Sequence, residues 1–124
     1  MRESHAQEVI DAVSSIRLTA VSLEYDIHGL IEQRLKNAGI EFVHEAKLGR
    51  GKRVDFLCGA TAVEVKKGTP SPAVLLKQVS GYLSSDDVSD IVIVTKGRVK
   101  LPAAIGGKRV FMISLDRLWG ISLP

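Results

Sequence analysis

Residues 53–67 read RVDFLCGATAVEVKK, an apolar stretch that contains two acids and a following lysine. Two short β-like runs flank Gly59 and Ala60. A two-residue loop that begins with glycine is typical of a type II′ hairpin turn. That turn fixes the register of the two strands, and it places Asp55 directly opposite Glu64. The hairpin therefore brings two acidic side chains together in a segment that is otherwise apolar.

The alternation of side chains along a strand assigns the charged residues to one face of this hairpin. Asp55 shares its face with Glu64, Lys66 and Arg53. Like charges placed directly opposite each other, about 4.5–5.5 Å apart at Cβ, destabilise a hairpin, so another interaction must offset the repulsion. The residues expected on the opposite face are Val54, Phe56, Val63 and Val65.

Two explanations of the acidic pair remain open at this stage. The first is a salt-bridge network on an exposed sheet face, in which Lys66 and Arg53 neutralise the acids. The second is a divalent cation held between the carboxylates of Asp55 and Glu64, because Mg²⁺ prefers oxygen ligands and often takes one or two carboxylates together with water and substrate phosphates. In that interpretation Lys66 would orient or deprotonate a water molecule, or stabilise negative charge on a phosphoryl oxygen.

Helices and further strands are expected on both sides of the hairpin. Apolar residues at helical spacing predict one helix over about 6–16 and another over about 22–37. In the second helix Glu24 lies about 40° from the centre of the apolar stripe, so it faces the protein body. The run EFVHEAKL at 41–48 predicts a strand, joined to the next strand by a four-residue GRGK loop.

The second half of the chain predicts a parallel extension of the sheet. Ser71 is a natural N-cap and Pro72 suits the first position of a third helix. DIVIVT at 90–95 predicts a central strand covered on both faces, RVFMISL at 109–115 a final strand, and 102–105 a short helical turn. The expected fold class is α/β, with a mixed central β-sheet flanked by helices.

Composition is that of an ordinary folded domain. The 124 residues are expected to form one domain, with a helical extension over 1–20 and a core over about 22–116. A net charge of +3 permits an anionic partner, although an ordinary basic surface explains it equally well. With Cys58 as the one cysteine, an intramolecular disulfide is excluded and a cytoplasmic location is expected. No run approaches the roughly 20 apolar residues that span a bilayer, so no membrane association is expected.

Asp55 followed by Glu64-Val65-Lys66 closely resembles the PD-(D/E)xK nuclease superfamily, with Val54 in place of the leading proline. The order helix, three-stranded meander, helix, strand matches the superfamily core over about 24–97. The resemblance implies a restriction-endonuclease-like core (αβββαβ plus a further strand), similar to small resolvase-like, RecB-like or phage-type nucleases. It also implies that Mg²⁺, for which Mn²⁺ can substitute, is the cofactor.

The resemblance assigns roles to individual residues. Asp55 and Glu64 would bind the metal, the backbone carbonyl of Val65 would be a further ligand, and Lys66 would position or activate water. Superfamily members add an acid from the first core helix, for which Glu24 is the best candidate.

Glu45 is the second candidate for the third acid. With a four-residue GRGK loop Glu45 would face away from Asp55, whereas a one-residue slip in register would reverse that orientation.

The third helix carries a second similarity. Gln78 and Tyr82 match the QxxxY signature of the RecB-like branch, which lies beside the active site. Gln78 stands within an apolar stripe and would need a hydrogen-bonding partner, such as Glu64, a metal-bound water or a substrate phosphate. Tyr82 would contact DNA or pack in the core.

A basic segment precedes the acidic pair. Its residues would grip phosphates or remain solvated turn charges. The residues expected to contact nucleic acid are Arg50, Lys52, Arg53, Lys67 and Tyr82.

The sequence therefore predicts a Mg²⁺-dependent endonuclease that hydrolyses DNA phosphodiester bonds in a structure-selective or nonspecific way. Dimerisation is expected because cutting both strands of a duplex needs two sites. The alternative is a catalytically inert nuclease-like module that binds DNA or a protein partner.

Overall fold

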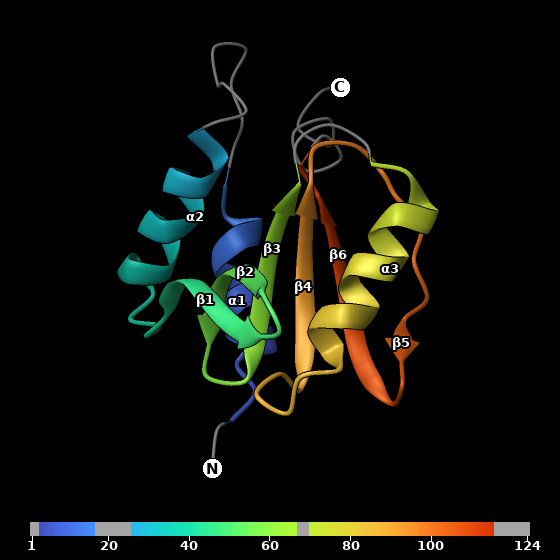
Figure 1. The fold of residues 1–124 in the computed structure, drawn as a ribbon. Coiled ribbons are helices and arrows are strands. Elements are labelled where there is room, and N and C mark those ends of the chain that lie inside the picture. Colours follow the sequence, from blue (N-terminus) through green and yellow to red (C-terminus); the bar gives the residue numbers. More distant parts are fainter. Residues whose placement is uncertain (1–2, 17–25, 67–69, 116–124) are drawn as a thin grey trace.

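The protein forms a mixed sheet with helices on both faces, as predicted, and the sheet has six strands where five were expected (Figure 1). The computed structural model describes residues 3–16, 26–66 and 70–115. The strands lie in the order β1-β2-β3-β4-β6-β5; β3, β4 and β6 run parallel, and the other neighbours are antiparallel. The elements are α1 (Ala6–Ser14), α2 (Asp26–Asn37), β1 (Val43–Gly49), β2 (Lys52–Cys58), β3 (Thr61–Lys66), α3 (Pro72–Leu83), β4 (Asp90–Thr95), β5 (Ala104–Ile105) and β6 (Lys108–Ser114).

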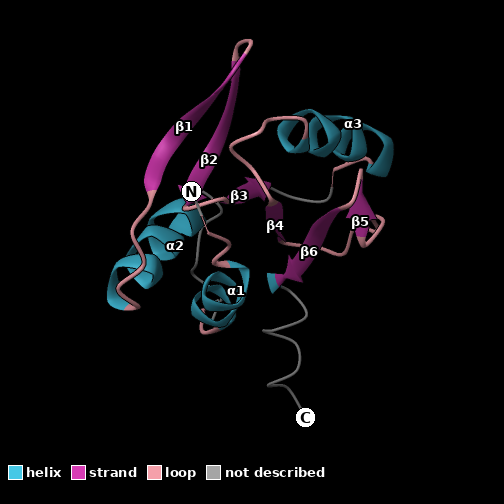
Figure 2. Ribbon diagram, turned by 90° about the horizontal axis from the view of Figure 1, so that it is seen from below, coloured by secondary structure: helices cyan, strands magenta, loops and turns pink. Residues whose placement is uncertain are grey.

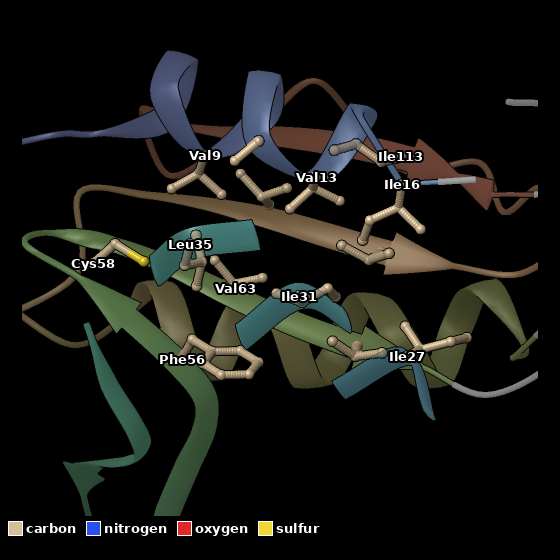
Figure 3. Packing of buried hydrophobic residues seen from close by; sticks show 14 of the residues in the cluster. Val9, Val13, Ile16, Ile27, Ile31, Leu35, Phe56, Cys58, Val63 and Ile113 are labelled. Carbon is tan, nitrogen blue, oxygen red and sulfur yellow. The ribbon is translucent and has the colours of Figure 1, made fainter. Parts of the chain in front are cut away.

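Each face of the sheet has its own hydrophobic cluster. Helices α1 and α2 cover one face and α3 covers the other (Figure 2). On the first face, Val13 and Ile31 from the helices pack against Phe56 and Val63 from the sheet (Figure 3). Strand β4 is buried along its whole length. DIVIVT at 90–95, with its continuous apolar run at 91–94, was therefore correctly interpreted as a central strand. Among the described residues, no helix is long and apolar enough to cross a membrane.

The β2–β3 hairpin has the predicted register. Phe56 pairs with Val63 and Cys58 pairs with Thr61. Gly59 has φ +59°, whereas Ala60 is not among the residues with positive φ, which is the combination that a type II′ turn requires. The turn residue alone thus sufficed to align the two strands.

The amino-terminal segment packs closely over this turn. The backbone N–H of Ala60 donates a 2.9 Å hydrogen bond to the carbonyl of Glu3. A Cβ at Gly59 would lie 2.5 Å from that same carbonyl oxygen. Ser4 Oγ adds a 2.5 Å hydrogen bond to Asp90 at the start of β4. Glycine is therefore required at position 59 both for its backbone conformation and for this close approach.

The β1–β2 connection differs from the prediction. The four-residue GRGK loop is wrong, because Gly49 pairs with Lys52 and the turn consists of Arg50 and Gly51 alone. These two residues have φ +53° and +75°, as a type I′ turn requires at both central positions. Arg50 thus adopts a left-handed conformation that is uncommon for arginine and that its residue type did not indicate.

Two smaller features also differ from the prediction. The expected helical turn at 102–105 is wrong: Ala104 and Ile105 form β5, which pairs with the start of β6. Gly106 and Gly107 have positive φ and reverse the chain between these strands. At the start of α3, Pro72 takes the first turn as expected, but the side chain of Ser71 makes no capping hydrogen bond.

Lys108 anchors the carboxyl end of α3 to the sheet. Its Nζ donates to the carbonyl oxygens of Leu83, Ser85 and Val88 at 2.8, 2.9 and 2.6 Å. We expect Lys108→Met to lower the free energy of unfolding by about 2 kcal/mol, because part-buried carbonyls would lose their donors. Urea denaturation would measure this loss. Lys36→Met, at an exposed position in α2, is the matched control, and equal stability of the two variants would contradict the anchoring role.

Candidate active site

Asp55 and Glu64 lie where strands β2 and β3 diverge. The backbone ladder between these strands is last seen at the pair Phe56 and Val63. Beyond that pair, backbone N–H groups donate to the side-chain carboxylates of Asp55 and Glu64 instead of to backbone carbonyls of the neighbouring strand. The N–H of Val65 donates to Asp55 Oδ2 at 2.7 Å, and the N–H of Asp55 donates to Glu64 Oε1 at 3.1 Å. The two acids therefore bridge the separating strands, next to each other as the hairpin register requires.

Glu64 is the buried centre of this cluster, with 5% of its surface exposed. Its Oε2 accepts a hydrogen bond from the hydroxyl of Tyr82 at 3.0 Å and lies 3.0 Å from Lys66 Nζ. Burial raises the pKa of the Glu64 carboxyl, and the nearby charge of Asp55 raises it further. The hydrogen bond and positive charge of Lys66 offset only part of this increase.

Tyr82 reaches the cluster from helix α3. Its pKa is raised, first by burial and then by the charge of Glu64 and the hydrogen bond to it. The ring lies among the partly buried residues of the cluster beneath α3. Tyr82 was predicted to pack in the core or to contact DNA, and its contact with Glu64 was not predicted. The helical spacing in α3 indicates which side of the helix carries Tyr82, but it does not identify the residue of β3 beneath it.

Gln78 is not buried in an apolar stripe, as the sequence suggested. Its side chain is exposed, and no hydrogen bond joins it to the described residues. Leu75 and Val79 occupy the buried face of α3, and Gln78 lies beside that face. The helical spacing was read correctly, but Gln78 lies far enough around the helix to reach solvent.

The β1–β2 hairpin extends beyond β3 as a two-stranded arm, here defined as residues 46–54 (Figure 2). Val54, expected beside Phe56, instead packs with Ala46 in the cluster under α3. Glu45, with φ +52°, interrupts the regular strand geometry just before the arm. The arm therefore turns its apolar side toward α3, and the strict alternation assumed for β2 fails there.

A groove of about 430 Å³ lies between the arm and α3, here called the arm groove. The side chain of Lys52 connects the arm to α3, because its Nζ lies 3.4 Å from the carbonyl oxygen of Gly81. Arg50 is exposed at the tip of the arm, and Lys67 lies outside the described residues. The lining residues are Gly51, Lys52, Arg53, Lys77, Gln78, Gly81 and Tyr82.

The third acid of the resemblance has no established position. Glu24 lies outside the described residues. A bulge between Lys47 and Gly49 shifts the register of β1 and β2 by one residue from the one expected, so position 45 falls opposite Asp55. However, Glu45 is exposed and pairs with Arg53 at 3.7 Å. Within residues 3–16, 26–66 and 70–115, no three His, Cys, Asp or Glu side chains are grouped closely enough to hold a metal.

The donor set present nevertheless suits Mg²⁺, which often binds through one or two carboxylates and keeps several waters. Asp55 and Glu64 supply the carboxylates. The N–H of Val65 faces Asp55 across the strand gap, and in a β-strand the carbonyl of the same residue faces the same side. The Val65 carbonyl is therefore directed to the gap that contains the acids, and oxygen is the ligand type that this cation prefers.

Comparisons with known proteins leave the family open. No family model matches the chain, and no curated protein matches it. One solved structure, a CdiA-CT/CdiI toxin and immunity complex from Burkholderia pseudomallei, matches at 20% identity with a TM-score of 0.38. The match covers 82% of this chain and 89% of that chain. A likeness at this score supports no inference about function.

Proposed function

We propose that the protein is a Mg²⁺-dependent nuclease of the PD-(D/E)xK type that hydrolyses DNA phosphodiester bonds. The observation that carries the proposal is the joint position of Asp55, Glu64 and Lys66. The two carboxylates bridge the strand gap, and Lys66 Nζ lies 3.0 Å from Glu64 Oε2. The order of α2, β1, β2, β3, α3 and β4 along the chain is the order of the superfamily core, which supports the same assignment.

Each residue has a distinct role in this proposal. Asp55, Glu64 and the Val65 carbonyl would hold the cation, which would supply an activated water and stabilise charge on the phosphoryl oxygen. Lys66 orients the attacking water or the scissile phosphate. The Tyr82 hydroxyl fixes one oxygen of Glu64. Glu24 remains the proposed third acid, and Gln78, which lines the arm groove, would contact substrate rather than Glu64.

The burial of Glu64 favours a functional site over a structural salt bridge. A surface ion-pair network would leave both partners in solvent, where each pair contributes little. Instead, Glu64 is buried beside a second acid, and its raised pKa shows that the charged form is disfavoured. A group that costs free energy in the folded protein is characteristic of active sites. A cation between the acids would offset this cost.

Cleavage assays on a panel of DNAs test the proposal. Supercoiled, linear, branched and single-stranded DNA would each be incubated with the protein and Mg²⁺ or Mn²⁺, with EDTA as the control. We expect cleavage of at least one DNA, with no cleavage in EDTA. Absence of metal-dependent cleavage from every DNA would instead favour the second candidate, an inert module that binds nucleic acid or protein.

Mg²⁺ affinity is expected to rise with pH. Because the Glu64 pKa lies above its ordinary value, protons compete with the cation until the pH exceeds that raised pKa. At pH values below the pKa of Glu64, the affinity for Mg²⁺ should increase by up to about tenfold per pH unit. At pH values above that pKa, the affinity for Mg²⁺ should level off. Calorimetric titration with Mg²⁺ at several pH values measures this dependence. An affinity that does not change over the acidic range would contradict the role of Glu64.

The same shift predicts an opposite trend for stability without metal. A carboxyl whose pKa is higher in the folded than in the unfolded state contributes stability below its unfolded pKa. That contribution is lost as the pH rises through the folded pKa. The contribution of Glu64 to the free energy of unfolding should therefore fall over the pH range in which Mg²⁺ affinity increases.

A further inference from the structure

A second groove lies next to the candidate active site, at the carboxyl ends of β4 and β6. Its volume is about 500 Å³, and it is here called the β4–β6 groove. Its floor includes Val99, which is buried in the cluster under α3, and Met112, which packs against that cluster. The lining residues are Thr95, Arg98, Val99, Lys100, Met112 and Ser114.

The position of this groove follows from the register of the parallel strands. Thr95 at its edge is the direct neighbour of Lys66 in the β3–β4 ladder. Tyr82, which lines the arm groove, donates a hydrogen bond to Glu64. Glu64 and Lys66 therefore each adjoin one of the two grooves, and the hydrogen bond from Tyr82 places the Glu64 carboxylate on the face of the sheet that α3 covers.

Both grooves have the chemistry of a surface that binds a nucleic-acid strand. Arg98 and Lys100 are exposed at the β4–β6 groove, and Lys52, Arg53 and Lys77 line the arm groove. None of the described lining residues is acidic. Cations of this kind hold phosphates without regard to sequence, while an apolar floor such as that of the β4–β6 groove can accept a sugar or base.

We propose that one nucleic-acid strand crosses the active site from the arm groove to the β4–β6 groove, with Arg98 and Lys100 holding the phosphates beyond Lys66. This inference rests on the proposed nuclease function and deepens it. A strand held on both sides of the cation site presents an internal phosphodiester bond, so cleavage is endonucleolytic. Free strand ends are not required.

The binding test removes the two cations of the β4–β6 groove. Arg98→Ala with Lys100→Ala would be compared with Arg34→Ala with Lys36→Ala, which removes the same residue types from α2 on the opposite face of the sheet (Figure 2). Both pairs are made in an Asp55→Asn background, and binding to a fluorescent single-stranded DNA of about 16 nucleotides is measured at several salt concentrations. We expect the slope of log affinity against log salt to fall by about 1.4 for the groove pair. The α2 pair should not change it.

Cleavage of a closed single-stranded circle tests the second part of the proposal. Wild-type protein with Mg²⁺ should linearise the circle. If linear strands are shortened from their ends while the circle survives, the crossing path is wrong and the nuclease function stands. If wild-type protein cleaves neither DNA, the proposed nuclease function is wrong. The salt dependence of binding then still tests whether Arg98 and Lys100 hold phosphates. Equal slopes for the groove pair and the α2 pair would overturn the assignment of Arg98 and Lys100.

Discussion

Replacing Asp55 with asparagine is expected to lower Mg²⁺-dependent DNA cleavage by on the order of 10³-fold. The substitution removes one negative charge from the cation site and keeps a side-chain oxygen that can accept the hydrogen bond from the Val65 N–H. The strand gap should therefore remain closed by the same contact. Initial cleavage rates at saturating Mg²⁺ measure the loss, and thermal unfolding without metal verifies the fold.

Lys66→Ala and Lys36→Ala form a matched pair for this experiment. Lys66 Nζ lies 3.0 Å from Glu64, whereas Lys36 forms an ion pair with Glu32 on the surface of α2. The first substitution should lower cleavage by roughly 10²–10⁴-fold, and the second should leave it unchanged. Wild-type rates in both Asp55→Asn and Lys66→Ala would rule out the proposed catalytic roles.

Replacing Glu64 with glutamine is expected to move activity and stability in opposite directions. Cleavage should fall by on the order of 10³-fold, because a neutral amide is a far weaker ligand for a hard cation. In the absence of metal at neutral pH, the free energy of unfolding should rise by about 1 kcal/mol, because glutamine removes a buried charge and its repulsion from Asp55. Lys66 remains partly exposed, so water can solvate its ammonium group.

The stability of the Glu64→Gln variant separates the two explanations of the acidic pair. If the cluster is a structural salt bridge, loss of the Glu64 charge should destabilise the protein. Urea unfolding in EDTA at pH 7, compared with wild type, measures the difference. A clear loss of stability would favour the salt bridge, whereas a gain together with lost cleavage fits a site that contains a cation in its working state.

The sequence predicted the sheet best where one residue type dictates the local geometry. Glycine at position 59 fixed the turn, and hence the register that brings Asp55 and Glu64 together. The continuous apolar run at 91–94 identified the central strand, because a strand covered on both faces has apolar side chains on both.

Prediction failed where tertiary contacts override local preference. The left-handed conformation of Arg50 closes the first turn with two residues instead of four. A bulge between Lys47 and Gly49 then shifts the register of β1 by one residue, so that Asp55 and not Phe56 falls opposite position 45. Gln78 was predicted to lie within the apolar stripe of its helix, yet it is exposed beside the buried face of α3. The contact of Tyr82 with Glu64 depends on how α3 lies over β3. The position of the β4–β6 groove beside Lys66 depends on the β3–β4 alignment. The periodicity of apolar residues predicts neither how a helix packs over a strand nor how two parallel strands align.

Location of the cation is the most direct test of the proposed site. Crystals grown with Mn²⁺ would be examined by anomalous scattering at the manganese edge. We expect one peak within about 2–2.5 Å of carboxylate oxygens from both Asp55 and Glu64, with the Val65 carbonyl also in contact. A well-ordered site without a peak, in which Glu64 still binds Lys66 and Tyr82 at saturating Mn²⁺, would contradict the proposal.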